Sequence, residues 1–554
     1  MFINGREVED GSSFNSNVCI IGGGMAGITI AMELKKQGID VCVLESGGHG
    51  PDNATRDLYR GENIGVPYIF SDGCRSRFLG GSSNCWGGWC APMDAHDFQT
   101  RDWVNESGWP ISLTDVIPYY KRAHDVLQLG PFNYSASFWE KAINHTEVKR
   151  LKDESGTLID KISQFSPPVR MGEFYNEDLK TNGVRVFLYS NVTDIECDED
   201  GNEITRVKVT SLKGNNFSII SDIFILATGG IENARLLLSS DTVHKNGLGN
   251  SNDLVGRYFM DHLRLSMGQI FFSKDWTRNR FYDLKYHYHS RIVSALGTSV
   301  ASQLSVSPEI QEKEGLLNAR VSFSSVLPGE GTTGALALWN CKQAFKKKEP
   351  KDFSATKEIL NIISHPIDAG SYGLTRIYRP HFLVKAVKFY IITEQEPNPQ
   401  SRVVLSNEKD QLGMRRVKVN WQIGATEQHT IDKTLAVVGE KIQQSGVASQ
   451  VVMDRTLTGK EWPDDIEGVW HHMGTTRMHQ SPRKGVVDKD CKVHGIENLF
   501  VAGSSVFPTG GANFPSITLV ALALRLSDHI KCRLTARNIK VSKAQITDAE
   551  LEHK

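Results

Sequence analysis

The feature that most constrains this chain is a glycine-rich turn between two apolar runs near its N-terminus. Residues 17–21 form an apolar run that leads directly into Gly22-Gly23-Gly24-Met25-Ala26-Gly27. A second apolar run, residues 41–44, ends in Glu45. A strand, a glycine turn, a helix and a second strand that ends in an acid form the pattern of a dinucleotide-binding βαβ unit. The sequence therefore predicts an α/β domain with a parallel sheet, although a plain glycine-rich βα turn is the alternative interpretation.

Each part of this turn has a physical task in holding a dinucleotide. Gly22 permits the tight turn, Gly24 lets the backbone approach a pyrophosphate, and Gly27 lets the helix pack closely on the strand. The helix N-terminus offers free amides to an anion, and Glu45 can accept hydrogen bonds from a ribose hydroxyl. The candidate binding residues of this unit are Gly22, Gly24, Met25, Ala26, Gly27, Glu45 and Ser46.

Composition excludes several classes of protein. Hydrophobic residues make up 40% and charged residues 23% of the 554 residues, and the formal net charge is −1. Nucleic acid and an anionic membrane surface are therefore poor first guesses for a partner. The nine cysteines show no metal spacing and no disulfide framework, and no apolar segment is long enough for membrane insertion. We expect a cytoplasmic protein without a bound metal.

Two patterns of predicted secondary structure alternate along the chain. Residues near both ends and around 185–265 carry short strands followed by helices, as pieces of one parallel α/β unit do. Residues 266–464 contain β-rich runs that predict an antiparallel sheet with helices, at 281–290, 316–326, 385–394, 401–405 and 415–421. A helical, partly basic insertion from about Gly334 to Pro380 interrupts them, and its lysines 346–348 are most simply a solvated face. Residues 1–16 are expected to form a short arm.

A second strand-turn-helix segment lies in the middle of the chain. A strand at 184–189 leads to Val192, and a strand at 218–226 ends in Ala227-Thr228-Gly229-Gly230 before a helix at 232–238. Small residues at such a turn bring the backbone close to a ligand. Alone, this segment could be a plain βα connection. Together with the N-terminal turn, it predicts the second wall of a flavin dinucleotide site, with Val192, Ala227, Thr228 and Gly229 as binding residues.

The C-terminal segment carries the candidate chemistry. It contains His471-His472-Met473-Gly474, then residues 498–508 with Gly503 and Ser504, and then a turn that runs from Thr509 to Ser516. An apolar helix follows from 517 to about 530. Pro515 suits a helix start, and the amides of Ser516 and its neighbour point off the helix end. Such an end can hold the negative charge of a reduced flavin, with Gly503, Ser504, Phe514 and Ser516 nearby.

These motifs together resemble the glucose–methanol–choline (GMC) oxidoreductase family, whose members use FAD to oxidise alcohols. The loop from Arg75 to Trp86 resembles the family segment along the flavin, and residues 230–238 resemble its second sequence pattern. Residues 255–262 and 394–403 also resemble family segments, the latter opening a strand of the substrate sheet. By this resemblance, further FAD-binding residues are Arg77, Gly80, Gly81, Ser82, Asn84, Cys85, Trp86 and Asn233.

The resemblance also implies the domain plan. We expect a discontinuous, Rossmann-like FAD-binding domain from residues 1–100, 185–265 and 465–535. A substrate domain, built on an antiparallel sheet with helices, is expected from residues 101–184 and 266–464. Residues 536–554 are expected to form a polar tail.

The family pattern places a catalytic histidine three residues before the glycine of the HxxG segment, which is His471 here. A near-neutral imidazole can take the hydroxyl proton of an alcohol while the carbon-bound hydrogen leaves as hydride. The neighbouring His472 is the rival, although adjacent residues on an extended segment face opposite sides. The family's partner group precedes a proline, yet this chain has Asn513-Phe514-Pro515. We favour Asn513, because an amide can bind the substrate oxygen and Phe514 cannot.

Substrate and acceptor follow from the resemblance only in outline. The first expectation is oxidation of a hydroxyl of a sugar, glycoside or aminocyclitol, with dioxygen or another electron acceptor. A non-sugar alcohol and a flavoprotein lyase without net redox chemistry are the alternatives. A nicotinamide-dependent dehydrogenase would share the glycine turn but would not explain the C-terminal segment. Cys85 excludes a histidyl flavin link at its position and is either a thioether link or a packed thiol. The sequence does not indicate the oligomeric state.

Overall fold

The strand before the glycine turn is β2 (Ser12–Ile21), which lies inside a parallel sheet. The computed structural model describes residues 1–68, 74–151, 153–273, 280–284, 293–326, 330–345, 353–378, 384 and 386–552. β2 pairs with β3 (Val41–Leu44) on one side and with β10 (Asn216–Leu226) on the other. The sheet is completed by β7 (Arg185–Leu188), β1 (Phe2–Asn4), β20 (Leu499–Val501) and the antiparallel pair β9 (Ile204–Thr210) and β8 (Asn191–Cys197).

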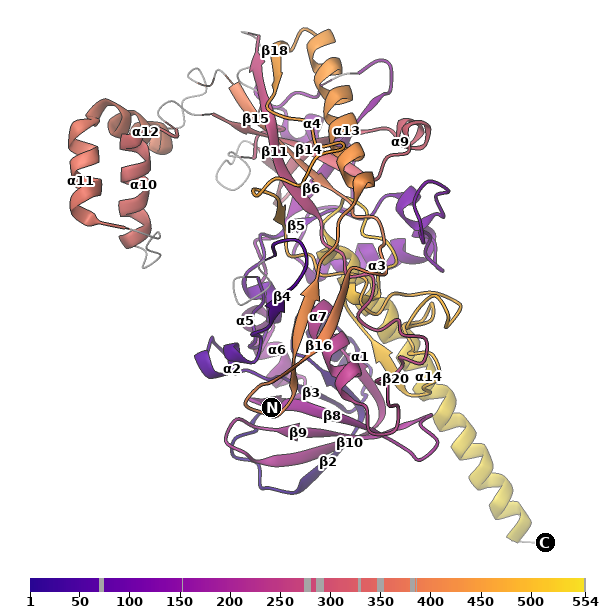
Figure 1. Cartoon of the computed structure of the whole chain (residues 1–554). Coiled ribbons are helices and arrows are strands. Elements are labelled where there is room, and N and C mark those ends of the chain that lie inside the picture. The colour runs from indigo at the N-terminus through magenta and orange to yellow at the C-terminus, as the bar shows by residue number, and fades with distance from the viewer. Residues whose placement is uncertain are drawn as a thin grey trace.

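This sheet joins three distant parts of the chain, as a discontinuous Rossmann-like domain requires (Figure 1). The apolar runs of β2, β3 and β10 end in buried residues, which is typical of parallel strands that are covered on both faces. The expected N-terminal arm is wrong in one respect. Residues Phe2 to Asn4 form β1 in parallel register with Val186 to Leu188, because β7 offers an open edge for backbone hydrogen bonds.

Helices α1 (Met25–Lys36), α7 (Gly230–Ser239) and α14 (Pro515–Glu552) belong to this half of the molecule. Helix α3 (Leu113–Val126) packs on α14, although we expected it in the substrate domain. The Tyr120 hydroxyl lies 2.9 Å from the Thr518 hydroxyl, and Arg122 pairs with Glu33 at 2.6 Å and with Asp528 at 2.8 Å. The backbone of α14 continues as helix through residues 536–552, where we expected a polar tail.

The second sheet is antiparallel and forms the upper half of the molecule in Figure 1. Its strands, in spatial order, are β18 (Ala448–Met453), β11 (Leu263–Phe272), β15 (Ala386–Thr393), β14 (Ala319–Ser325), β13 (Thr298–Val306), β6 (Leu158–Phe165) and β5 (Trp89–Cys90). β19 (Glu467–Gly468) pairs with β11, and β12 (Ser294–Ala295) pairs with β13. Helix α13 (Ala425–Gln444) packs against this sheet.

Three of the expected strands do not join this sheet as predicted. The runs at 401–405 and 415–421 form β16 (Arg402–Lys409) and β17 (Arg415–Asn420), which make a separate sheet with β4 (Glu62–Asn63) beside α7. Of the run at 281–290, Asp283 forms an isolated bridge with Phe323, and residues 285–290 lie outside the described residues. Alternating hydrophobicity identifies a strand but not its neighbour, because the pairing partner lies far away in sequence.

The predicted helical insertion is confirmed as α10 (Thr333–Phe345), α11 (Ala355–Ser364) and α12 (Pro366–Tyr378). These helices stand to one side of the large sheet (Figure 1), and lysines 346–348 lie outside the described residues. The shorter helices are α2 (Asn53–Asp57), α4 (Ala136–Ile143), α5 (Met171–Phe174), α6 (Asn176–Thr181) and α9 (Pro308–Glu314), with 3-10 turns η1 (Gly81–Asn84), η2 (Ala95–Phe98) and η5 (Ser504–Val506). Within the described part of the chain, no helix has both the length and the apolarity to cross a bilayer.

Candidate active site

One cavity of about 780 Å³ lies where the two sheets meet. Its lower wall is built from the strand ends and turns of the parallel sheet, including the glycine turn after β2 and the turn after β10. Its upper wall comes from the antiparallel sheet, which contributes Gln303 from β13, Ser322 from β14 and Tyr390 from β15. This volume falls within the usual range for small-molecule and cofactor sites. The cavity therefore joins the predicted dinucleotide turns to a separate polar face.

The glycines of the lower wall leave room that side chains would fill. A Cβ placed on Gly24 would come no closer than 3.9 Å to any neighbour, and one on Gly229 or Gly503 would meet nothing within 4 Å. By contrast, a Cβ on Gly27 would stand 2.0 Å from the Gly22 carbonyl oxygen. Gly27 therefore allows close packing of α1 on β2. Gly24, together with Gly229 and Gly503, leaves open space along the lower wall of the cavity, which we call the cofactor cradle. No side chain caps the start of α1, so its first amides remain available to an anion.

Glu45 closes one end of this cradle. Its carboxylate is buried and accepts hydrogen bonds from the backbone N–H groups of Gly23 at 3.0 Å and Gly47 at 2.8 Å. Burial raises the pKa of Glu45 despite these bonds. Each carboxylate oxygen keeps a second lone pair, so the group can still accept from ribose hydroxyls.

A buried ion network that sequence reasoning missed lies beside the glycine turns. Arg75 and Arg77 donate to the two carboxylate oxygens of Glu232 at 3.0 and 3.1 Å, and Arg235 lies 3.3 Å from the same group. Both guanidinium groups from the loop stack on the Tyr59 ring, at 4.0 and 4.8 Å from its centroid. Burial acts to raise the pKa of Glu232, but the three arginines lower it to about 2. The sequence signal for this network is weak, because only Arg235 is close to Glu232 in the chain, whereas Arg75 and Arg77 lie 157 and 155 residues away from it.

Most predicted cofactor residues line the cavity. These are Gly22, Gly24, Met25, Ala26, Glu45, Ser46, Arg77, Gly81, Ser82, Cys85, Trp86, Val192, Ala227, Thr228, Gly229, Gly503, Ser504, Phe514 and Ser516. Gly27, Gly80, Asn84 and Asn233 stand behind the wall. The Asn84 amide donates to Leu79 and Gly81 carbonyl oxygens, both at 3.0 Å. The Asn233 amide joins Thr228 to Ala502 and so connects the two turns that follow β10 and β20.

His471 lies at the junction of the two walls. It follows β19, and its backbone N–H and that of Trp470 both donate to the Asp261 carboxylate at 2.7 Å. Burial raises the pKa of Asp261 to about 6, although several hydrogen bonds act against this rise. Burial also lowers the pKa of His471 well below its usual value, and the neighbouring His262 and His472 add to this effect. The imidazole of His471 is therefore neutral near pH 7.

A histidine that we did not predict fixes the tautomer of His471. The Nδ1 atoms of His262 and His471 lie 2.8 Å apart, and His262 Nε2 lies 2.8 Å from the Gly511 carbonyl oxygen. A carbonyl oxygen can only accept, so His262 carries its proton on Nε2. Burial lowers the pKa of His262 to about 4, so its Nδ1 is unprotonated and accepts from His471 Nδ1–H. The free lone pair of neutral His471 is consequently on Nε2.

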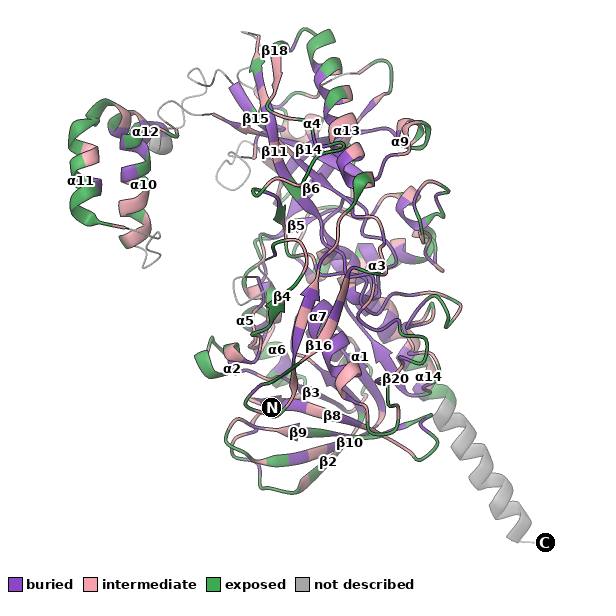
Figure 2. Cartoon of the chain, in the orientation of Figure 1, coloured by how far each residue is buried: buried purple, intermediate pink, exposed green. Residues whose placement is uncertain are grey.

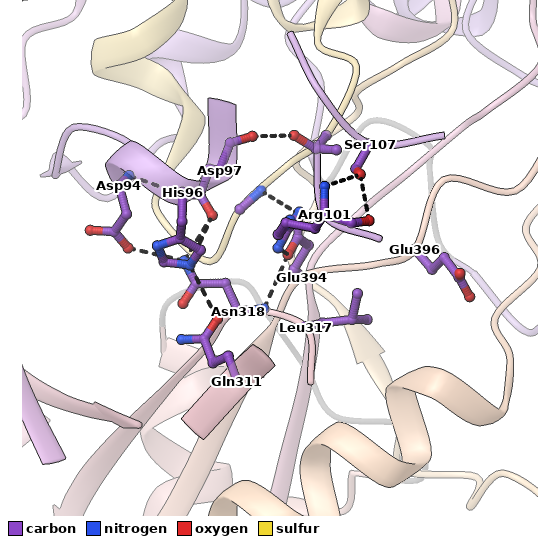
Figure 3. A network of polar contacts seen from close by, with 12 residues as sticks. Asp94, His96, Asp97, Arg101, Ser107, Gln311, Leu317, Asn318, Glu394 and Glu396 are labelled. Carbon is purple, nitrogen blue, oxygen red and sulfur yellow. Dashed lines mark hydrogen bonds and ion pairs between the residues drawn. The ribbon is translucent and has the colours of Figure 1, made fainter. Parts of the chain in front are cut away.

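A polar network around Arg101 and Glu394, which Figure 3 draws, holds the backbone of Gly511 in place. Arg101 and Glu394 form a bidentate pair at 2.8 and 2.7 Å in which both side chains are buried. The same carboxylate accepts from Gly511 N–H at 3.1 Å and from Asn318 N–H at 3.1 Å. Glu394 follows β15, so the network ties the turn that precedes α14 to the antiparallel sheet. Successive hydrogen bonds therefore connect Arg101 to Glu394, Glu394 to Gly511, Gly511 to His262, and His262 to His471.

The structure does not bring Asn513 to His471, contrary to our expectation. The Asn513 side chain is buried away from the cavity and its amide donates to the Pro92 carbonyl oxygen. Phe514 lines the cavity instead, with its ring edge-on to His471 at 5.8 Å between centroids. His472 packs against the Phe259 ring at 5.8 Å. The polar neighbour of His471 is therefore His262. From the sequence, we had assigned its segment, residues 255–262, only to the edge of the flavin domain.

The acidic cluster beside this network does not have the features of a metal site. Asp94, His96 and Asp97 bring their ligand atoms together at one end of the antiparallel sheet. The Asn318 amide donates to both carboxylates, at 3.0 and 2.9 Å, and Lys161 pairs with Asp94 at 2.7 Å. Asp94 Oδ2 therefore has two donors, and the Lys161 ammonium already supplies the positive charge that a metal would bring to it.

Two family models match the chain in the segments that build this cavity. A model described as FAD dependent oxidoreductase matches residues 17–244, and one described as GMC oxidoreductase matches residues 397–523. The first covers the glycine turn and the turn after β10. The second covers His471, Gly511 and the start of α14.

Known proteins resemble the chain over different lengths. The fructose dehydrogenase large subunit of Gluconobacter japonicus is 25% identical over 353 residues, which span 63% of this chain and 54% of that protein. The 6'''-hydroxyparomomycin C oxidase of Streptomyces lividus is 22% identical and covers 94% of this chain and 92% of its own length. The crystal structure of pyridoxine 4-oxidase from Mesorbium loti shares the fold, with a TM-score of 0.55, 15% identity and coverage of 93% and 99%. These matches support assignment to the GMC oxidoreductase family, and the cofactor is FAD.

Proposed function

We propose that this protein oxidises a hydroxyl group of a sugar, a glycoside or an aminocyclitol. The observation that carries this proposal is the contact of His262 with His471, which lines the cavity, because this contact leaves the unprotonated Nε2 of His471 available to a substrate. The names of two relatives, a fructose dehydrogenase subunit and a hydroxyparomomycin oxidase, support the substrate class. Both reactions, by those names, act on polyhydroxylated molecules.

The lower wall would hold the cofactor. The amides of Met25 and Ala26 at the start of α1 would hold the pyrophosphate, and Glu45 would hold a ribose hydroxyl. The free amides at the start of α14, including that of Ser516, would face negative charge. Bound FAD supplies a two-electron acceptor for the hydride that leaves the substrate carbon. The open space at Gly24, Gly229 and Gly503 supports this assignment.

His471 would act as the general base. Its Nε2 would accept the hydroxyl proton, and a positioned base of this kind accelerates a reaction by about 10²- to 10⁴-fold. His262 would hold the correct tautomer by accepting from Nδ1–H, and Asp261 would fix the backbone of the histidine through its N–H group. Phe514, edge-on to the imidazole, would restrict the ring's rotation and exclude water from its side.

The upper wall suits a molecule with several hydroxyl groups. Gln303, Ser322, Ser324 and Tyr390 provide both donors and acceptors from neighbouring strands. Trp89 and Trp470 also line the cavity, and aromatic rings pack well against the apolar faces of sugar rings. Gln303 and Ser322 already bond to each other at 2.6 Å, but a long apolar alcohol would offer no partner to the hydroxyl groups of Ser324 and Tyr390, which disfavours it as the substrate.

An anaerobic titration of the FAD-loaded protein tests the reaction. Addition of the right sugar or aminocyclitol should bleach the flavin absorbance in proportion to the substrate added. A panel that includes simple alcohols separates the substrate classes. Turnover that leaves the flavin oxidised would instead indicate a lyase and would contradict the proposal.

A substitution at the histidine tests the role of the base. His471→Ala should keep its FAD but slow flavin reduction by about 10²-fold or more in a stopped-flow experiment. The matched control is His145→Ala, because His145 is an exposed histidine on a distant surface. Unchanged reduction in His471→Ala would refute the assignment.

The proposal also includes the electron acceptor, which is dioxygen or another acceptor, and the cellular compartment. We place the protein in the cytoplasm, which the odd number of cysteines supports, since reducing compartments favour thiols. Peroxide release measured against dye reduction distinguishes an oxidase from a dehydrogenase.

A further inference from the structure

The helical insertion of residues 333–378 has an unusual distribution of side chains. Its three helices pack on one another, with α10 in contact with both α11 and α12. The residues buried between them are small or polar: Gly334, Ala335, Ala337, Glu358, Ala369, Tyr372 and Thr375. A Cβ on Gly334 would stand 2.6 Å from the His365 carbonyl oxygen, so the helices approach closely at this glycine. Small residues at helix contacts are typical of helices that face an apolar surrounding.

The large apolar side chains of the insertion point outward. Eight of the sixteen exposed large hydrophobic residues among the described residues lie on these three helices: Leu336, Trp339, Phe345, Ile359, Leu360, Ile363, Ile367 and Leu374. Phe345 is 92% exposed, Ile367 85% and Ile363 67%. Figure 2 shows that exposed and half-buried residues dominate these helices, whereas the strands of the large sheet to their right are mainly buried. A water-facing unit would bury such side chains instead.

The apolar residues follow helical spacing. Leu336 and Trp339 are three positions apart on α10, and Ile359 and Ile363 are four apart on α11. Ile367 and Leu374 are seven apart on α12. Residues at these spacings share one face of a helix. Each helix therefore carries an exposed apolar stripe.

The insertion is also basic, although the whole chain is not. Residues 333–378 contain seven Lys and Arg against four Asp and Glu, whereas the chain as a whole has a net charge of −1. One of those acids, Glu358, is buried and accepts from the Asn340 amide at 3.0 Å, so its carboxylate lies between the helices and not on their outer face. Exposed apolar stripes combined with lysines are the pattern of helices that lie on anionic membranes.

We propose that this insertion binds the surface of a bilayer that contains anionic lipids. Its helices have 13, 10 and 13 residues, which is shorter than the roughly 20 residues of a spanning helix, so they lie in the plane of the interface. Ile363 and Ile367 enter the apolar boundary, and Lys342 and Lys357 face the lipid phosphates. The enzyme body remains in water, attached through the segments on either side of the insertion. This inference is independent of the alcohol substrate.

Vesicle sedimentation of the full-length, FAD-loaded protein tests the proposal. The probes are vesicles of phosphatidylcholine alone and vesicles in which part of this lipid is replaced by phosphatidylglycerol. We expect the protein to sediment with the second kind and to be released by high salt. Each buried isoleucine contributes about tenfold in partition, so Ile363→Ser with Ile367→Ser should lower binding by about 100-fold.

Two control variants separate lipid binding from other causes. Phe174→Ser removes an exposed aromatic ring elsewhere and should leave vesicle binding unchanged. Lys342→Glu with Lys357→Glu should weaken binding to the anionic vesicles by about fivefold or more per residue. All variants should keep their FAD absorbance and helical circular dichroism, because none of these residues lines the cavity.

Three outcomes would overturn the proposal. The first is an absence of sedimentation with either kind of vesicle. The second is equal binding of wild type and the isoleucine variant. The third is self-association of the lipid-free protein that the isoleucine variant abolishes, without vesicle binding, since this would assign the apolar stripes to a second copy of the chain.

Discussion

The contact between His262 and His471 yields a sharp prediction about the rate of flavin reduction. Glutamine and asparagine at position 262 preserve different halves of the histidine's bonding. His262→Asn keeps a carbonyl oxygen near the position of Nδ1, where it can accept from His471 at the 2.8 Å contact. His262→Gln places its amide near the position of Nε2, so it keeps the donor to the Gly511 carbonyl oxygen and loses the acceptor.

The expected effect follows from the cost of an unpaired donor. Without an acceptor, the buried Nδ1–H of His471 loses its partner at a cost of about 1–3 kcal/mol, or its proton moves to Nε2 and blocks the base. Because about 1.4 kcal/mol corresponds to tenfold in rate, reduction should slow by roughly 5- to 150-fold in His262→Gln. His262→Asn should recover most of this loss. Both effects should be smaller than that of His471→Ala.

Anaerobic stopped-flow spectroscopy with saturating substrate measures this step directly. The pH dependence of the reduction rate should shift in His262→Gln, since the imidazole that loses its partner has a different pKa, and a purely structural defect would not shift it. Flavin content and the unfolding midpoint serve as checks that both variants fold. If asparagine and glutamine slow reduction equally, or if neither does, the tautomer argument is refuted.

Two further predictions concern the cofactor cradle and the ion network. Gly24→Val should fold with near-wild-type stability but bind FAD at least about tenfold more weakly, as measured by flavin absorbance, because its Cβ meets no atom within 3.9 Å yet enters the cradle. Gly27→Val should instead destabilise the fold, and loss of FAD in neither variant would contradict the assignment. The arginines lower the pKa of Glu232 from 4.5 to about 2 in the folded protein, so the ionised carboxylate stabilises the fold at pH values above 4.5. This stabilisation is lost as the pH falls from 4.5 to about 2. Glu232→Gln should therefore remove up to about 3 kcal/mol of acid-dependent unfolding free energy, measured by denaturant titration at several pH values, and an unchanged pH profile would disprove it.

The strands and turns around the cofactor could be predicted because their signals are local. The strand at 41–44, the turn after β10 and the helix that begins at Gly230 agree with the structure within one or two residues. Glycine tolerates backbone conformations and close approaches that other residues do not, so its spacing carries structural information by itself. His471 could be placed for the same reason, since its distance from Gly474 is a short-range pattern.

Features that depend on contacts between distant residues could not be predicted. The runs at 401–405 and 415–421 looked like strands of the large sheet, but they pair with each other, and the second also pairs with Glu62 and Asn63, in a small sheet beside α7. The first residues of the chain looked like an arm because a strand of three residues has little signal until β7 offers it an edge.

Within the candidate active site, local sequence pointed to His471 as the proposed base, and tertiary structure determined which groups contact it. The backbone conformation of the turn before α14 decides whether Asn513 or Phe514 faces the cavity. Because the Asn513 amide donates to the Pro92 carbonyl oxygen, Phe514 is the residue that lines the cavity. His262 lies 209 residues from His471 in sequence, and no spacing rule links two residues so far apart. Only the folded chain, in which the Arg101–Glu394 pair holds Gly511 beside His262, brings the two imidazoles together, because hydrogen bonds depend on distance in space and not along the chain.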